Sequence, residues 1–89
     1  MNKVFLSGKI NKQPDVVYTP RGEKLLMFPL WVDEGAFSID VVFTERQGAT
    51  HFSGTTGRNI IVSGELTKAS GKSQQPLRIM AHKIIWMEE

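Results

Sequence analysis

Apolar and polar positions alternate along most of this chain, and this alternation restricts it to β-strands. In residues 23–32 one set of alternate positions is wholly apolar: Leu26, Phe28, Leu30 and Val32. Successive side chains of a strand point to opposite faces, so this run predicts a strand with one face in a core. The opposite face carries Leu25, Met27, Pro29 and Trp31. Because proline donates no backbone hydrogen bond, we expect this strand to lie at a sheet edge or to be bulged at Pro29.

Four other segments are predicted to be strands: residues 2–10, 37–43, 59–68 and 77–87. Residues 33–36 are predicted to form a tight hairpin turn between two of them. The alternation slips between Ala81 and Ile84, which predicts a β-bulge near His82 and Lys83. Residues 11–21 are predicted to be a loop, and 44–57 a connection with at most one short helix around 45–52.

Five strands with at most one short helix between the third and fourth predict an all-β fold, the five-stranded Greek-key barrel called the OB-fold. Eighty-nine residues suffice for one such domain, residues 1–89, and the chain stops soon after its last strand, so we expect no C-terminal tail. It has no run of 18 apolar residues, which predicts no membrane span. It has no cysteine, so neither a disulfide nor a thiolate metal site is expected. A cytoplasmic protein without a cofactor is the simplest interpretation.

Positive charge is concentrated in two stretches, although the formal net charge is only +2. Residues 1–24 hold five lysines and arginines against two acidic residues, and residues 58–83 hold five against one. A sheet that placed these stretches side by side would present a positive surface to a polyanion. A solvated surface of mixed sign is the simpler interpretation, and charge alone favours it.

Motifs in order along the chain resemble those of bacterial single-stranded DNA-binding proteins. They are NKVFLSG at 2–8, YTPRG at 18–22, the alternating Phe28, Leu30 and Val32, GRNIIVSGEL at 57–66 and IMAHKIIWM at 79–87. The resemblance implies an OB-fold that binds single-stranded DNA, with RNA as an alternative ligand. It also implies a role in replication, repair or replication restart, with replication or primosome proteins as further partners.

The chain departs from that family in three places. The turn at 33–36 is short, residues 44–56 match the family's helix poorly, and no acidic tail follows the last strand. The tailless primosomal replication protein N family is similar in this respect. Its motifs resemble VFLSG at 4–8, THFS at 50–53 and the lysine-bearing hairpin at 68–78. The motifs do not decide between the two branches.

Single-stranded nucleic acid is bound by aromatic side chains that stack on bases and by basic groups that follow the phosphates. Trp31 points away from the core and is a stacking candidate, with packing at a subunit interface as the alternative. Phe37 is either a stacking residue or a core residue, whereas Phe43 and Trp86 are expected to pack in the core or at an interface. Tyr18 is expected to anchor its loop.

The basic candidates come from two places in the sequence. The resemblance implies that the hairpin between the last two strands grips nucleic acid through Lys68, Lys72 and Arg78. The other basic candidates, which would extend the phosphate track, are Lys3, Lys9 and Arg21. A solubilising loop is the alternative interpretation of the hairpin.

Catalysis is not expected. The two histidines lack the spacing of a metal site, and the acidic residues of 33–45 have no evident partner for acid–base chemistry. The competing function is a protein-interaction or primosome-assembly module, because a fold does not fix a function.

A small barrel with few stacking sites would bind weakly as a monomer. The resemblance implies a homodimer formed by pairing of first strands across a two-fold axis, with a homotetramer if the outer sheet faces also pack. Residues 2–7 are short, apolar on one face and free of proline, as such an edge requires.

Overall fold

The computed structural model describes residues 1–44, 57–69 and 76–87. Within them lie six strands: β1 (Val4–Ile10), β2 (Asp15–Tyr18), β3 (Lys24–Val32), β4 (Phe37–Thr44), β5 (Asn59–Lys68) and β6 (Leu77–Trp86). The short helix predicted around 45–52 and the predicted binding residue Lys72 lie outside the described residues. No helix in the described ranges is long and apolar enough to cross a membrane.

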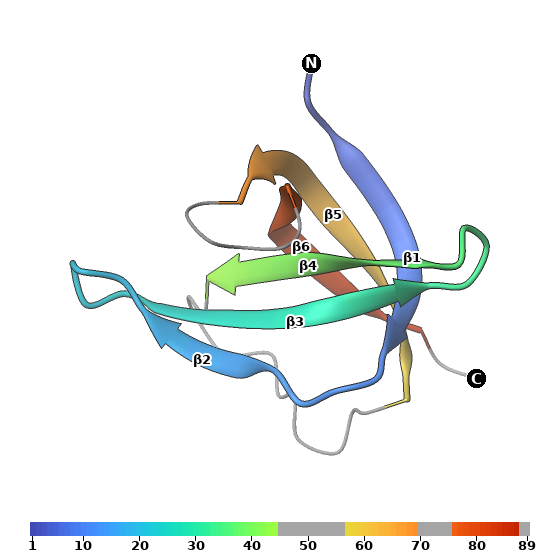
Figure 1. The fold of residues 1–89 in the computed structure, drawn as a ribbon, viewed down its shortest axis with the longest axis horizontal. Coiled ribbons are helices and arrows are strands. Elements are labelled where there is room, and N and C mark those ends of the chain that lie inside the picture. The colour runs from blue at the N-terminus through green and yellow to red at the C-terminus, as the bar shows by residue number, and fades with distance from the viewer. Residues whose placement is uncertain (45–56, 70–75, 88–89) are drawn as a thin grey trace.

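The strands form one sheet that closes on itself. Their order is β1-β5-β6-β4-β3-β2, and an additional pairing of β1 with β3 completes a barrel of β1, β5, β6, β4 and β3. Only β4 and β6 are parallel among the pairs of described strands. Figure 1 shows β3 between β4 and β2, with β1 passing across the end of β3. The predicted all-β OB-fold is confirmed, and its five strands are β1, β3, β4, β5 and β6.

The alternation predicted for the barrel strands is also confirmed. Ile10, Phe28, Leu30, Val41, Ile60, Val62 and Ile79 are almost completely buried. They come from all five barrel strands, so the core fills the barrel interior, and the residues between them point outward. Gly8 lies where β1 crosses β3, and a Cβ there would overlap the carbonyl oxygen of Trp31. A side chain at position 8 would therefore push the two strands apart.

The loop predicted over residues 11–21 is partly wrong, because β2 lies within it. β2 pairs with the first half of β3, from Asp15 opposite Met27 to Tyr18 opposite Lys24. Its four residues are all exposed, so it has no apolar–polar alternation to reveal it. The β-branched residues Val16 and Val17 were the available signal.

The expectation that this strand lies at a sheet edge or is bulged at Pro29 is wrong. β3 pairs with β4 on one side from Leu25 to Val32, without a register shift at Pro29. On the other side of β3, β2 pairs only as far as Met27, and β1 pairs from Leu30 onward. Pro29 therefore lies in a two-residue gap between β2 and β1, and on that side it has no partner among the described strands. Proline is tolerated at positions where a strand is locally unpaired.

The predicted bulge in the last strand is confirmed. Ser63 of β5 pairs with Lys83, but the next residue, Gly64, pairs with Ala81. His82 is thus the extra residue on β6. Gly64 permits the close approach of the strands there, because a Cβ at this position would overlap the carbonyl oxygen of Met80.

Candidate nucleic-acid interface

The outer face of β3 carries a continuous strip of half-buried apolar side chains. The strip consists of Leu25, Met27, Pro29 and Trp31, which alternate with the buried core residues of the same strand. β4 lies alongside and presents Ser38, Asp40, Val42 and Thr44 to the same face, because directly paired residues share a face. In OB-folds these two strands form the face that binds oligonucleotides.

Trp31 and Lys9 lie next to each other on this face. Lys9 of β1 pairs with Trp31 of β3, which pairs in turn with Ser38 of β4. Their chain neighbours Ile10 and Leu30 are completely buried, so Lys9 and Trp31 must point outward, as predicted for Trp31. The indole Nε1 of Trp31 donates a hydrogen bond to Oδ1 of Asp33, 3.1 Å away. This bond orients the ring, and Lys9 places a cation beside it.

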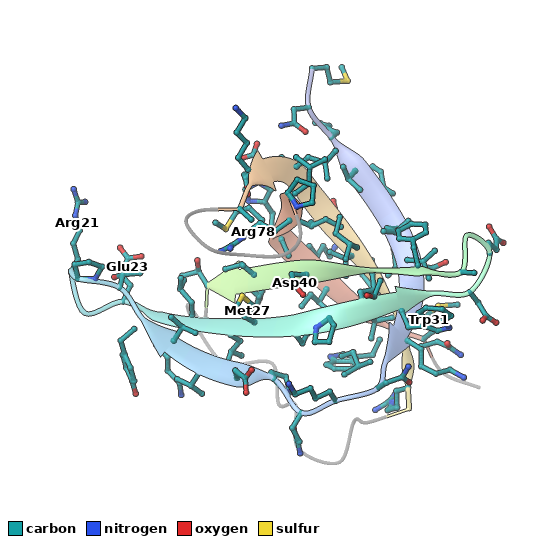
Figure 2. The ribbon with its side chains drawn as sticks, viewed as in Figure 1. Arg21, Glu23, Met27, Trp31, Asp40 and Arg78 are labelled. Carbon is teal, nitrogen blue, oxygen red and sulfur yellow. The ribbon has the colours of Figure 1, made fainter. Side chains whose placement is uncertain are left out.

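A second group lies in the middle of the face. Arg78 of β6 pairs with Asp40 of β4, which pairs with Pro29 of β3. Figure 2 shows Met27, Asp40 and Arg78 in the central part of the sheet, with Trp31 toward the β1 crossing. The Nε of Arg78 is buried and has no hydrogen-bond partner among the described residues. A buried donor left unsatisfied costs about 1–3 kcal/mol.

The remaining basic candidates fall into two places. Lys68 ends β5 beside Arg78, whose partner is Thr67. Lys3 lies at this same end of β5, because the amide side chain of Asn2 bonds to both backbone groups of Leu66, at 2.7 and 2.9 Å. Lys9 lies opposite Asn59 at the start of β5, so cations lie at both ends of this strand. The pairing of β1 with β5 thus brings the two basic stretches of the sequence together.

Arg21 is not part of this group. It is exposed in the turn between β2 and β3, and Figure 2 shows it with Glu23 at the far tip of that hairpin. A track of phosphates along β5 would not reach it directly.

The structure also places the other aromatic residues. Phe37 begins β4 at the rim of the barrel and shares a face of this strand with the core residue Val41. Its side chain is 44% exposed, so it is neither a core residue nor a member of the outer face. Phe43 and Trp86 pack against the core, as expected. The Arg58 guanidinium lies over the Trp86 ring, 5.3 Å from its centroid. The prediction that Tyr18 anchors its loop is wrong, since its side chain is 67% exposed.

One hollow borders this region. It has a volume of ≈ 430 Å³, and its lining includes Ser7 and Gly8 of β1, Asp33 and Glu34 of the turn, and Asn59. Among the described residues there is no cluster of three or more histidine or acidic side chains that could hold a metal ion. The chemistry on this face is therefore that of apolar contact, aromatic stacking and hydrogen bonding from cationic donors.

Comparisons with known proteins agree with this architecture. The single-stranded DNA-binding protein of Thermus aquaticus matches with a TM-score of 0.81 and 22% identity over 100% of this chain. The dimeric N-terminal domain of PriB from Thermoanaerobacter tencongensis matches with a TM-score of 0.75 and 21% identity, covering 99% of this chain and 98% of that one. The Plasmodium falciparum SSB in complex with single-stranded DNA matches with a TM-score of 0.67 and 19% identity, covering 99% and 96%.

These likenesses are structural. No family model matches the sequence, and no curated protein matches it. The chain spans 41% of the Thermus aquaticus protein. Identities near 20% carry information about the fold, and both branches that the motifs resemble are represented among the structures. This chain is therefore a β-barrel with the OB-fold that bacterial single-stranded DNA-binding proteins and PriB share.

Proposed function

We propose that this protein binds single-stranded DNA with little sequence preference, in DNA replication, repair or replication restart. The observation that carries the proposal is the pairing of Lys9 with Trp31 on the outer face of β1 and β3. An oriented indole beside a cation combines the two devices that bind single strands, a stacking surface for a base and a charge for its phosphate.

The rest of the face extends this contact in two directions. Met27, Pro29 and Leu25 continue the apolar strip along β3, where bases can lie flat against half-buried side chains. Lys68 and Arg78 lie toward the other end of β5 from Lys9 and can neutralise further phosphates. The carboxylate of Asp40, in the middle of the face, repels phosphates. The phosphate backbone of the DNA is therefore expected to run beside Asp40, with the bases lying over this carboxylate.

The comparisons support this proposal. Two of the similar structures are single-stranded DNA-binding proteins, and one of them was solved with single-stranded DNA. Trp31 lies on one of the two strands whose face OB-folds use for oligonucleotides, and Lys68 and Arg78 lie beside the loop that joins the last two strands. Lys9, on β1, pairs with Trp31.

Titration of the protein with a thymidine oligonucleotide tests the proposal. We expect tryptophan fluorescence to be quenched, because a base that stacks on Trp31 changes its surroundings. We expect the affinity to fall steeply with salt, with a log–log slope of about −0.7 for each phosphate contact on a single strand. A duplex of the same length is the control and is expected to bind poorly. Absence of both quenching and a mobility shift at low salt would refute single-stranded DNA binding.

A protein-interaction module is the second candidate, and exposed apolar side chains favour it. Phe5 is 73% exposed on the outer face of β1, and Val16, Val17 and Ile85 are also exposed. A largely apolar protein contact would depend little on salt, unlike binding to DNA. The salt series in the same titration therefore separates the two functions.

We also propose that the chain assembles as a homodimer through β1. One side of β1 pairs with β5 from Val4 to Lys9, but its other side pairs with β3 only at Lys9 and Ile10. Residues 4–8 therefore have an edge without a partner among the described strands, and such an edge pairs readily with another strand. A second copy of β1 fits this edge and would join two barrels into one longer binding surface. Packing of the outer sheet faces would then give a tetramer.

Light scattering across a concentration series tests the dimer. We expect the mass of two chains at tens of micromolar for the unchanged protein. Phe5→Lys is expected to shift it toward the monomer, since a charge on an edge strand opposes pairing. Gln13→Lys adds the same charge at an exposed position between β1 and β2 and should leave the mass unchanged. A monomer in the unchanged protein would refute the dimer, and a normal dimer in Phe5→Lys would place the interface elsewhere.

A further inference from the structure

The hairpin of β2 and β3 exposes an aromatic side chain that the interface described above does not use. Tyr18 ends β2 and is 67% exposed. It pairs with Lys24 at the start of β3, so the ring and this lysine share a face of the hairpin. Arg21 is exposed in the turn between them. An exposed tyrosine that shares a face with a lysine repeats the chemistry of Trp31 and Lys9.

The turn that carries this group is held by its own hydrogen bonds. The backbone N–H of Thr19 donates to the Glu23 carbonyl at 2.9 Å, and that of Gly22 donates to the Thr19 carbonyl at 2.8 Å. The Thr19 Oγ1 accepts a further bond from the Glu23 N–H at 3.0 Å. Gly22 has a φ of 85°, which glycine adopts at little cost. The turn is thus defined before any ligand arrives, which reduces the entropy lost when a base binds to Tyr18.

We infer that Tyr18 is a second stacking site for single-stranded DNA, with Arg21 as its phosphate contact; this inference rests on the proposed function. A tyrosine ring that has no core to pack into leaves apolar area exposed to water, and a nucleobase covers such a ring without demanding a particular sequence. Glu23 lies in the same turn and opposes phosphate there, so Arg21 at the tip is the expected point of contact.

The two stacking sites are too far apart for a short oligonucleotide to reach both. Lys24, beside Tyr18, is seven positions from Trp31 along β3, about 23 Å at a rise of roughly 3.3 Å per residue. A stacked strand covers this distance with about seven nucleotides at roughly 3.4 Å each. Tyr18 and Trp31 also lie on opposite faces of the sheet, Tyr18 on the face that carries the core residues of β3 and Trp31 on the outer face. A DNA strand that contacts both must therefore pass around the edge of β2. Simultaneous contact with Trp31 and Tyr18 therefore requires an oligonucleotide longer than about seven nucleotides.

Binding of labelled thymidine oligonucleotides of six and of 20 nucleotides to the full chain, followed by fluorescence anisotropy, tests the inference. Tyr18→Ala is expected to weaken binding of the 20-mer by about five- to 150-fold, the range for one stacked base. Binding of the 6-mer should be unchanged. Tyr18→Phe keeps the ring and should retain the affinity of the unchanged protein for both lengths. Val17→Ala alters the neighbouring exposed residue on the opposite face of β2 and should also have little effect.

Three results would overturn the inference. If Tyr18→Ala binds the 20-mer as the unchanged protein does, Tyr18 is not a stacking site. If it weakens the 6-mer and the 20-mer equally and changes the mass in light scattering, Tyr18 is a contact between copies of the chain. If the unchanged protein binds neither oligonucleotide, the proposed function itself fails and this inference fails with it. A loss confined to the 20-mer would support the inference.

Discussion

Replacing Trp31 with alanine is expected to weaken binding of a thymidine oligonucleotide by about five- to 150-fold. Stacking of one base on an aromatic side chain contributes roughly 1–3 kcal/mol, and alanine removes the whole surface on which the base lies. The ring is held in place by its hydrogen bond to Asp33, so its loss is not easily replaced by a neighbouring side chain. The affinity is measured by anisotropy of a labelled oligonucleotide, because this variant loses the fluorescence of Trp31.

Two variants make the result interpretable. Trp86→Phe changes the other tryptophan, which packs against the core, and should leave the affinity unchanged. Trp31→Phe keeps an aromatic ring and should retain more affinity than Trp31→Ala. If Trp31→Ala binds as tightly as the unchanged protein while remaining folded, bases do not stack on Trp31, and the proposed interface on β1 and β3 would be wrong.

The second large effect is expected on stability, from Phe28→Ala. Phe28 is 1% exposed and has the largest side chain among the fully buried residues. Truncation of a buried phenylalanine to alanine costs about 3–5 kcal/mol, through lost burial and the cavity left behind. Native domains are stable by about 0.05–0.15 kcal/mol per residue, or roughly 4–13 kcal/mol for the 89 residues here. Phe28→Ala is therefore expected to remove a large part of the stability of the barrel.

Met27→Ala is the matched control, because Met27 is the chain neighbour of Phe28 and lies on the opposite face of β3. We expect it to reduce the free energy of unfolding by less than half as much, and to weaken oligonucleotide binding by removing part of the apolar strip. Urea unfolding followed by circular dichroism measures the stability of both variants. Equal losses of stability would show that the outer face of β3 is packed as tightly as the inner face, which would leave no surface there for a ligand.

Local patterns were sufficient to predict most of the fold. The five barrel strands, the turn after Val32 and the bulge at His82 were all visible as alternation, a turn signal and a slip in the alternation. Alternation also placed Trp31 outside the core, because a strand with a buried Leu30 and Val32 must turn the residue between them outward. Each of these features depends on residues close together in the chain.

The features that were missed or left open depend on residues far apart in the chain. β2 has no alternation, and only its pairing with β3 makes it a strand. The two-residue gap at Pro29 exists because β2 ends and β1 begins on the same side of β3. Neither could be read from local sequence, since the strands concerned must first be placed beside each other.

The candidate site divides in the same way. The residue types suited to nucleic acid were recognisable in the sequence, since a tryptophan outside the core and clustered lysines match base stacking and phosphate contacts. Barrel closure decided which of them lie together: it placed Lys9 beside Trp31, Arg78 beside Asp40 and Arg21 far from both. It also left Tyr18 exposed, although the sequence had suggested that Tyr18 anchors its loop. Alternation sets the direction of a side chain within its own strand, but its neighbours come from strand pairing, which only the closed sheet defines.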